Sequence, residues 1–274
     1  MNIVMTIAGS DSGGGAGIQA DLKTFQELGV FGTSAITALT AQNTLGVEGI
    51  FPTSPDFVAQ QIDVVFKDMP IQAVKTGMLF STEIIEEVAN NLREKNVQLV
   101  VDPVMIAKGG ANLLQNQAVE TLRTNLLPLA TVLTPNIPEA EVLAGLEIQS
   151  ESDMHKAAKA ILGMGVNCVV MKGGHLEERD TATDTVFMAD GTSFKMVTPR
   201  INTKHTHGTG CTFSAALTAF LGQGIPLKEA LIEAKKFVQL ALENPLGIGH
   251  GHGPTNHFAY KQLKAICEVT IIEP

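Results

Sequence analysis

The chain has 274 residues, enough for a sizeable core and compatible with one large α/β domain. Its 28 acidic residues against 19 lysines and arginines give a net charge of −9, which argues against a nucleic-acid-binding face and against an anionic membrane surface. Local basic residues must therefore handle any phosphate. No break in composition and no low-complexity linker divides the chain, so we expect a single domain over 1–274.

The cysteines indicate a reducing compartment. Cys168, Cys211 and Cys267 lie far apart and form no CxxC pair, so neither a disulfide framework nor a zinc knuckle is indicated. The first residues lack a basic segment leading into a long apolar run, and no apolar run approaches about 18 residues. We therefore expect a cytoplasmic protein.

The chain opens with a predicted strand over 3–8, a glycine-rich loop and a helix over about 18–28. This order superficially resembles a dinucleotide-binding fingerprint, but no acidic residue follows a second strand about 20 residues later, which disfavours that interpretation. We expect instead that the loop backbone and Asp11 approach a small polar substrate. Asp21, in the helix, is either a substrate or loop contact or a solvated carboxylate.

A second buried strand over 33–41 leads to Gln42. Ligand-binding groups in open α/β sheets gather at the carboxyl ends of the strands. An amide side chain both donates and accepts hydrogen bonds, which suits a heteroaromatic ring carrying an amine beside a ring nitrogen. The alternative is that Gln42 and Asn43 merely form a turn.

Two further strands lead to candidate site residues. The strand over 73–79 contains Met78, which either lines a ligand pocket or fills the core. The strand over 97–101 is followed by Asp102, an acidic residue placed to organise Mg²⁺ near phosphates. Residues 108–110 are predicted to form a mobile loop near the same edge.

The next two strands repeat the scheme. In 131–143 a strand is followed by Asn136 and Glu139, and a helix starts near Pro138. An amide and a carboxylate three residues apart on one helical face suit a hydrated Mg²⁺, although acidic residues are also common in first helical turns for dipole reasons. The strand at 167–174 reaches Lys172, which could contact nucleotide phosphates as a point charge.

The segment HTHGTGCTFSAAL (205–217) predicts a loop that feeds a helix N-terminus. The amides of Gly208, Thr209, Gly210 and Cys211 could converge there on a phosphate or a developing oxyanion, because first-turn N–H groups lack helical partners. The helix dipole should lower the pKa of the Cys211 thiol and make it a candidate base or nucleophile. The alternative is a buried, inert cysteine beside a tight turn.

Two segments near the C-terminal end show less specific patterns. A hairpin is predicted about Asp190 and Gly191. Residues 245–257 are rich in glycine and histidine, and His250 and His252 are possible metal ligands without a partner cluster. We favour a loop that borders the nucleotide or the substrate.

Strand and helix patterns alternate about six times, which predicts a doubly wound, mainly parallel sheet. Helices are expected over 55–66, 81–94, 210–222 and 226–243. The carboxyl edge of such a sheet would gather an acidic pair, a lysine, an amide cradle and a candidate base, a set that suits phosphoryl transfer. No Walker A sequence occurs, so the expected kinase is not a P-loop protein.

Seven segments resemble, in order over about 3–258, the bacterial hydroxymethylpyrimidine/phosphomethylpyrimidine kinases of thiamine biosynthesis, members of the ribokinase-like superfamily. The segments are AGSDSGGGAGIQADLKTF, AQNT, VKTGML, DPVM, TPNIPEAE, MKGGH and NTKHTHGTGCTFSAA. The resemblance implies a three-layer α/β/α fold and ATP-dependent phosphorylation of 4-amino-5-hydroxymethyl-2-methylpyrimidine, first to its monophosphate and then to the diphosphate. It also implies Mg²⁺, a homodimer and, as a further candidate, a monovalent cation.

The resemblance assigns roles to individual residues. Gln42 would hydrogen-bond the aminopyrimidine. Lys172 would contact ATP phosphates, and Cys211 would occupy the position of the catalytic base. The ring would be surrounded by Gly9, Ala16 and Met78. Magnesium would be organised by Asp102 and Glu139. The anion hole would consist of Gly208, Thr209 and Gly210.

Two alternatives stay open. Pyridoxal kinases of the same subgroup share most of the phosphate machinery, although AQNT and HTHGTGCT favour the pyrimidine, and a dual activity is compatible with both. A non-catalytic protein that only holds a thiamine precursor would not need Lys172, Asp102, Glu139 and Cys211 together. A dehydrogenase with Cys211 as nucleophile lacks the acidic ribose contact.

Overall fold

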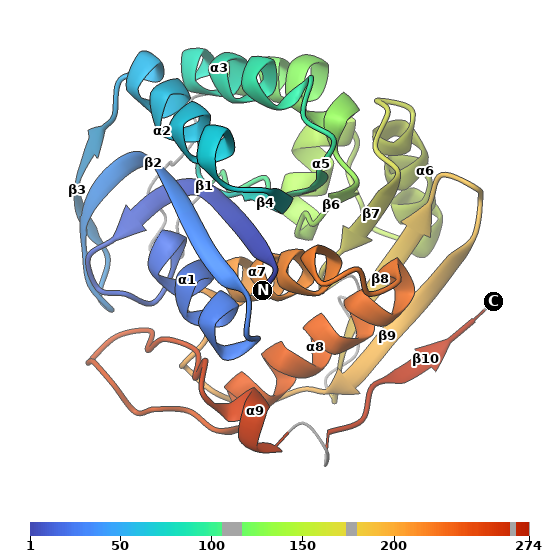
Figure 1. The fold of residues 1–274 in the computed structure, drawn as a ribbon. Coiled ribbons are helices and arrows are strands. Elements are labelled where there is room, and N and C mark those ends of the chain that lie inside the picture. The colour runs from blue at the N-terminus through green and yellow to red at the C-terminus, as the bar shows by residue number, and fades with distance from the viewer. Residues whose placement is uncertain (106–116, 174–179, 264–266, 274) are drawn as a thin grey trace.

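The computed structural model describes residues 1–105, 117–173, 180–263 and 267–273, and within them ten strands form one sheet (Figure 1). The loop predicted at 108–110 lies outside the described residues. The strands are β1 (Ile3–Asp11), β2 (Phe31–Gln42), β3 (Val47–Pro52), β4 (Ile71–Thr76), β5 (Gln98–Val101), β6 (Val132–Leu133), β7 (Cys168–Met171), β8 (Thr181–Met188), β9 (Ser193–Pro199) and β10 (Thr270–Ile272).

The order of the strands is β10-β9-β8-β7-β6-β5-β4-β1-β2-β3. The strands from β7 to β2 in this order run parallel, whereas β3 pairs antiparallel with β2, and β8, β9 and β10 continue antiparallel beyond β7. The predicted mainly parallel sheet is therefore confirmed. The predicted hairpin is also present, since β8 and β9 pair across a turn in which Gly191 has φ of +90°.

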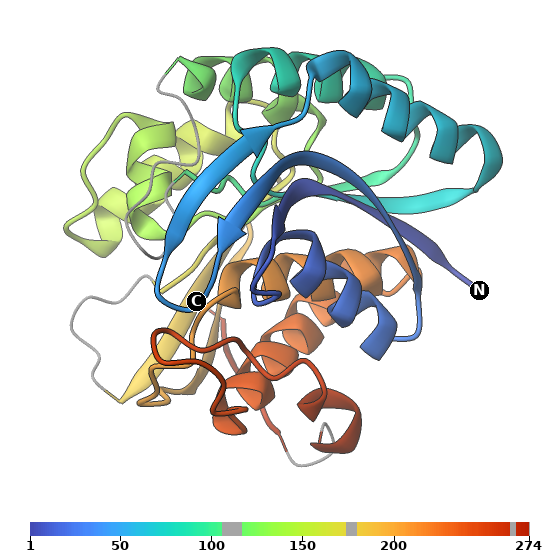
Figure 2. The ribbon, with the colours of Figure 1, turned by 90° about the vertical axis from the view of Figure 1, so that its left-hand side faces the viewer.

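Helices cover both faces of the sheet, which confirms the three-layer α/β/α architecture (Figures 1 and 2). One face carries α2 (Pro55–Asp68), α3 (Thr82–Leu92), α4 (Ala118–Thr121), α5 (Ile137–Ala144) and α6 (Glu151–Leu162). The other face carries α1 (Gly17–Glu27), α7 (Thr209–Gly222), α8 (Leu227–Glu243) and α9 (Ala259–Leu263). A π-helical turn, Leu122–Leu126, and a 3-10 turn, Leu127–Leu129, follow α4.

The central strands are largely apolar because side chains of alternating residues enter two different cores. In β5, Leu99 and Val101 pack with the layer of α2 to α6, whereas Val100 packs with α7 and α8. Leu133 and Val132 divide in the same way in β6. This two-sided burial explains why the strands appear in the sequence as continuous apolar runs.

Helix α7 is the central helix of its layer. It is apolar all round, and its residues from Thr212 to Gly222 are buried. A Cβ atom at Gly222 would lie 2.5 Å from Cγ1 of Val4, so the helix approaches β1 closely. This contact places the end of α7 beside the start of β1. The first turn of the helix lies at the opposite edge of the sheet, where Gly210 faces Lys172 just after β7. None of the helices formed by the described residues combines the length and the apolar character needed to cross a membrane.

Candidate active site

A cavity of about 450 Å³ lies at the carboxyl edge of the parallel strands. Most of the residues that the sequence singled out as site candidates line it, whereas Asp21, His250 and His252 do not, so the structure brings together groups from six strand ends and the start of α7. The candidates that line it are Gly9, Asp11, Ala16, Gln42, Met78, Asp102, Asn136, Glu139, Lys172, Gly208, Thr209, Gly210 and Cys211. Lys75, Thr40 and His207 also line the cavity and were not predicted.

One part of the cavity has a flat, close-packed wall. A Cβ atom at Gly9 would lie only 2.2 Å from Cε of Met78, so the absence of a side chain at residue 9 makes room for the methionine. Met78 itself is 7% exposed and packs against Ala38. Gly9 and Met78 therefore pack directly on each other and form one wall of the cavity.

The glycine-rich loop is organised by Asp11, whose carboxylate accepts hydrogen bonds from three backbone amides. Oδ1 accepts from Gly13 N at 2.8 Å, and Oδ2 accepts from Gly15 N at 3.0 Å and Ala16 N at 2.8 Å. Burial opposes the charge, but the bonds to His207 and these amides outweigh it and lower the pKa of Asp11. Both oxygens are thus already bonded within the protein, which assigns Asp11 to building the loop; a direct substrate contact stays a prediction.

The loop also touches the start of α7. Gly208 is the N-cap of the helix, with φ of +80°, and a Cβ atom there would lie 1.8 Å from the carbonyl oxygen of Gly15. Only glycine satisfies both the left-handed conformation and this approach. The first turn of α7 contains no acidic residue, so no carboxylate of its own opposes an anion at its N-terminus.

Cys211 lies in this first turn, but its predicted acidity is wrong. Burial raises the pKa of the thiol to about 11, against a partial lowering by the nearby charge of Lys75. The prediction considered the helix dipole alone and did not include the desolvation of a thiolate inside the cavity wall. At neutral pH the group is therefore a thiol in the ligand-free protein.

The cation of the site is Lys172. Its Nζ lies 3.2 Å from Oδ1 of Asp102, and a Cβ atom at Gly210 would lie 3.1 Å from the same Nζ. Burial opposes the positive charge, but the carboxylates of Asp102 and Glu139 raise the pKa of Lys172. Asp102 is 2% exposed and also accepts from the Ser214 hydroxyl at 3.2 Å. Lys172 is therefore positively charged and lies beside Gly210 in the first turn of α7.

Asn136 and Glu139 do not share a helical face as predicted, because Asn136 is the N-cap of α5. Its Oδ1 accepts from Glu139 N at 2.9 Å, and Glu139 Oε2 accepts from Asn136 N at 2.8 Å, which makes a capping box. Glu139 is 8% exposed. Burial raises its pKa to about 7, Lys172 opposes that rise, and the charge of Asp102 adds to it.

The donor set fits a hydrated magnesium ion. Two buried carboxylates, Asp102 and Glu139, repel one another at the cavity edge, and a divalent cation would relieve that repulsion. No group of three or more His, Cys, Asp or Glu side chains that could hold a metal occurs in the part of the chain that the structure describes. A small number of protein ligands suits Mg²⁺, because the ion keeps several waters and also binds substrate phosphates.

Beneath the cavity lies a buried ion pair that the sequence did not reveal. Lys75 and Asp21 have fully buried side chains, with Nζ 2.8 Å from each carboxylate oxygen, and Thr6 donates to Oδ2 at 2.6 Å. Both expectations for Asp21, a ligand contact or a solvated carboxylate, are therefore wrong. The sequence did contain one sign of this pair, which is a lysine inside a largely apolar strand. A charge buried in such a strand needs a partner of opposite charge.

The segment 245–257 packs against the end of β2 rather than forming a metal site. Gly251 N donates to Thr44 Oγ1 at 3.3 Å and His252 N donates to Thr44 O at 2.9 Å. His250 is exposed, and the His252 ring approaches only a backbone carbonyl, that of Lys204. The segment continues to Pro254, which forms a bridge with His207 beside the cavity.

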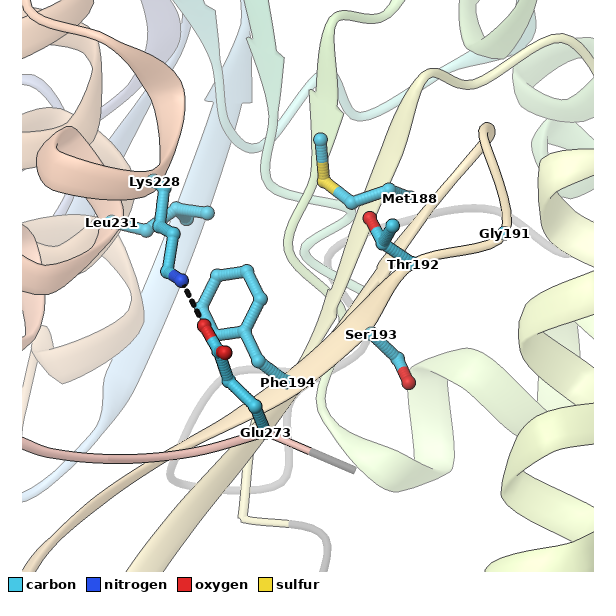
Figure 3. A pocket seen from close by; sticks show the side chains of 8 residues that line it. All are labelled: Met188, Gly191, Thr192, Ser193, Phe194, Lys228, Leu231 and Glu273. Carbon is cyan, nitrogen blue, oxygen red and sulfur yellow. Dashed lines mark hydrogen bonds and ion pairs between the residues drawn. The ribbon is translucent and has the colours of Figure 1, made fainter.

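A second cavity, of about 590 Å³, lies between the β8–β9 hairpin, α8 and the C-terminal segment (Figure 3). Its charged residues, Lys228 and Glu273, pair with each other, and the lysine also lies 5.2 Å from the ring centroid of Phe194. Its other lining is largely aliphatic or small. It therefore lacks the convergent polar groups that distinguish the first cavity.

Comparisons with known proteins agree with this geometry. A family model described as phosphomethylpyrimidine kinase matches residues 11–256. The chain is 57% identical over 260 residues to the hydroxymethylpyrimidine/phosphomethylpyrimidine kinase of Bacillus subtilis, covering 94% of this chain and 95% of that protein. It is 54% identical over 256 residues to the thiamine biosynthesis bifunctional protein ThiED of Geobacter sulfurreducens, covering 93% of this chain and 52% of that protein.

Among solved structures, the pyridoxal kinase from Staphylococcus aureus in complex with AMP-PCP and pyridoxal superposes with a TM-score of 0.89. The two sequences are 38% identical, and the match covers 100% of this chain and 99% of that one. The fold and the site thus define a small-molecule kinase of the ribokinase-like class, as the resemblance implied. Within that class, the chain belongs to the phosphomethylpyrimidine kinase family.

Proposed function

We propose that this enzyme phosphorylates 4-amino-5-hydroxymethyl-2-methylpyrimidine with ATP and then phosphorylates the monophosphate to the diphosphate for thiamine biosynthesis, within a single kinase domain over 1–274. The observation that carries the proposal is the position of the α7 start. Gly208 touches the glycine-rich loop beside the ring wall, and Gly210 touches Lys172 and Asp102. One helix N-terminus therefore joins the cavity wall that contains Gly9 and Met78 to a cluster suited to phosphates.

The chain's residues would divide the work as follows. Gln42 binds the aminopyrimidine edge, and Gly9 and Met78 enclose the ring. Lys172 neutralises charge on the transferred phosphoryl group as that charge develops. The amides of Thr209 and Gly210 bind its oxygens, and Asn136 adds a phosphate contact.

Magnesium would be held by Asp102 and Glu139 and would supply charge neutralisation on the ATP phosphates. Its few protein ligands leave room for water and phosphate oxygens. A monovalent cation is a further candidate cofactor, carried by the resemblance alone.

Cys211 is the proposed base of the first reaction only. In that step its thiolate form takes the proton of the substrate CH₂OH as the hydroxyl oxygen attacks the γ-phosphorus and the bond to the ADP oxygen breaks. In the second step the attacking oxygen belongs to a phosphate that is already ionised, so no base is required. Because the pKa of Cys211 is raised, only a small fraction of the protein carries the thiolate at neutral pH, and that thiolate is a strong base.

A second candidate activity is the phosphorylation of pyridoxal. It is favoured by the likeness to a kinase solved with pyridoxal bound, whereas the relatives of higher identity are named for the pyrimidine. The discriminating experiment is ATP turnover by the purified protein with Mg²⁺ and each acceptor. A higher kcat/KM for the pyrimidine supports the proposal, and turnover of pyridoxal alone contradicts it.

We also propose a homodimer and a cytoplasmic location. Leu39 of β2 and Phe51 of β3 are register partners at the sheet edge, and they are 50% and 72% exposed. An exposed apolar pair on an edge hairpin suits burial against a second copy. Dependence on ATP and three free cysteines suit the cytoplasm. Light scattering on the wild type and on Phe51→Glu tests the dimer, which the substitution should weaken.

A further inference from the structure

His207 lies between Asp11 of the glycine-rich loop and Gln42. Neither its position in the sequence nor the proposed reaction gives this histidine a role. Its side chain is 12% exposed, and its Nε2 is 2.9 Å from Oδ2 of Asp11. The same Nε2 is 3.3 Å from Nε2 of Gln42. A Cβ atom at Gly15 would lie 2.5 Å from Cδ2 of the imidazole, so the ring packs tightly on the glycine-rich loop.

The backbone of His207 is also held. Its N–H donates to Gly253 O at 3.1 Å, and its carbonyl accepts from Thr255 N at 3.2 Å. The imidazole therefore has little freedom to turn, and the hydrogen bonds of its Nε2 are determined by the groups that face it.

The proton on His207 follows from Asp11. An ionised carboxylate only accepts hydrogen bonds, and the loop amides already favour the ionised form of Asp11. Nε2 must therefore carry a hydrogen and donate it. A nitrogen that donates cannot also accept from the amide NH₂ of Gln42, so the contact with Gln42 Nε2 would join two donors.

The conflict at His207 indicates that the Gln42 amide lies the other way round, with its oxygen toward His207. The hydroxyl of Thr40 supports the same orientation. This hydroxyl lies 2.9 Å from Ser10 O and 3.1 Å from Gln42 Oε1, and it has one hydrogen to donate. If that hydrogen goes to the closer carbonyl of Ser10, Thr40 can only accept from Gln42. Turning the amide by a half-rotation removes both conflicts. The amide oxygen then faces the single hydrogen on His207 Nε2, which Asp11 and Gln42 share as two acceptors at 2.9 and 3.3 Å, and the amide nitrogen donates to Thr40.

We propose that His207, held by Asp11, is a positioning residue that fixes the orientation of the Gln42 amide and thereby selects an aminopyrimidine over a pyridoxal ring. This inference rests on the proposed function of the cavity. In the fixed orientation, the amide keeps one lone pair on the His207 side and one N–H on the Thr40 side for a ligand in the cavity.

The chemistry of the two rings explains the selectivity. An aminopyrimidine offers an amine donor beside a ring nitrogen acceptor, which matches an acceptor and a donor held in a set order. A pyridoxal ring carries a phenol oxygen and an aldehyde in place of the amine. A freely turning amide would serve both rings, whereas a fixed one favours the ring whose donor and acceptor match.

The test compares His207→Leu with the wild type in steady-state kinetics. We expect KM for the hydroxymethylpyrimidine to rise by about tenfold or more, with kcat within about threefold. The reason is that a Gln42 amide with no fixed orientation binds the substrate more weakly but does not touch the reacting atoms. The inhibition constant of pyridoxal against the pyrimidine should change by less than about threefold. His207→Gln, whose side-chain N–H can reach the same place, should recover most of the KM effect.

A double-mutant cycle shows whether His207 acts through Gln42. In the background of Gln42→Leu, the further change His207→Leu should raise KM by less than about twofold. His155→Leu is the matched control, because this histidine is exposed on α6 and its ring packs on Phe187, outside the lining of the cavity. It should leave KM unchanged.

The outcomes separate the inference from the function on which it rests. If His207→Leu leaves KM unchanged, weakens both ligands equally, or adds its full effect to Gln42→Leu, then His207 only supports the loop and the inference is overturned. If the wild type itself does not phosphorylate the pyrimidine, the proposed function fails first, whatever the variants do.

Discussion

The buried pair of Lys75 and Asp21 gives a stability prediction whose size follows from the structure. Replacing Lys75 by methionine keeps the length of the side chain and removes its charge, leaving the Thr6 hydroxyl as the hydrogen-bond donor to the fully buried carboxylate of Asp21. Breaking one side of a buried ion pair typically destabilises a protein by about 3–5 kcal/mol.

Protonation of Asp21 limits that loss. In the variant the carboxyl can become neutral by taking up a proton. The ordinary pKa of 3.8 lies roughly three units below pH 7, and each unit costs about 1.4 kcal/mol, so protonation at pH 7 costs about 4 kcal/mol. The pKa of the buried Asp21 is raised above its unfolded value in the variant, so the destabilisation grows as pH rises above that value. At pH 5 the same calculation gives about 1.6 kcal/mol.

Urea unfolding at pH 7 and pH 5 measures both quantities. Lys75→Met should lose about 4 kcal/mol at pH 7 and less than half of that at pH 5, and the apolar double variant Lys75→Met/Asp21→Leu should recover most of the loss. Lys156→Met is the control, because Lys156 is exposed and pairs with Asp153 on the surface, so its change should stay within about 0.5 kcal/mol. A loss in Lys75→Met below about 1 kcal/mol, or one that is equal at both pH values, would refute the reasoning.

Four further predictions concern the site. Cys211→Ala should slow the first phosphorylation far more than the second, and equal losses would remove Cys211 from the role of base. Because the pKa of the thiol is raised to about 11 and the thiolate is the active form, the wild-type kcat/KM of the first step should rise about tenfold per pH unit between about pH 7 and 9, whereas a flat profile would contradict the assignment. Lys172→Met should lower kcat by about 10²–10³ while Lys156→Met does not, as a coupled ATPase assay would show; a loss confined to KM would argue against charge neutralisation in the transition state. Gly208→Ala should abolish activity or destabilise the fold by more than about 2 kcal/mol, since its Cβ would meet the Gly15 carbonyl; an active, stable variant would exclude the close approach.

The predictable part of the site followed from the topology of a parallel sheet. Gln42, Asp102 and Lys172 each follow the carboxyl end of a strand, and such ends meet at one edge whatever the details of packing. The glycine loop before α7 was predictable for the same reason, since a helix start without acidic residues is a local feature of the sequence. The fold class and most residues of the site could therefore be predicted without knowing any distance between atoms.

The unpredicted part depends on contacts between distant segments and on burial. Asp11 and His207 are 196 positions apart, and Lys75 and Asp21 are 54 apart, so no local pattern connects them. The acidity of Cys211 was misjudged because its sign depends on desolvation, which only the packed cavity sets. The capping box of Asn136 and Glu139 was readable from the N-x-x-E spacing, but the carboxylate was considered as a metal ligand or as a first-turn acidic residue favoured by the helix dipole, and not as a partner of the Asn136 backbone amide.

The central claim is that one cavity carries out two successive phosphorylations of a pyrimidine. Phosphorus NMR of a reaction of the purified protein with ATP, Mg²⁺ and the hydroxymethylpyrimidine tests it most directly. We expect a monophosphate ester signal that rises and then falls as a pair of coupled diphosphate ester signals grows, with two ATP consumed per pyrimidine at completion. A reaction that stops at the monophosphate, or that leaves the pyrimidine unchanged while pyridoxal is phosphorylated, would contradict the account.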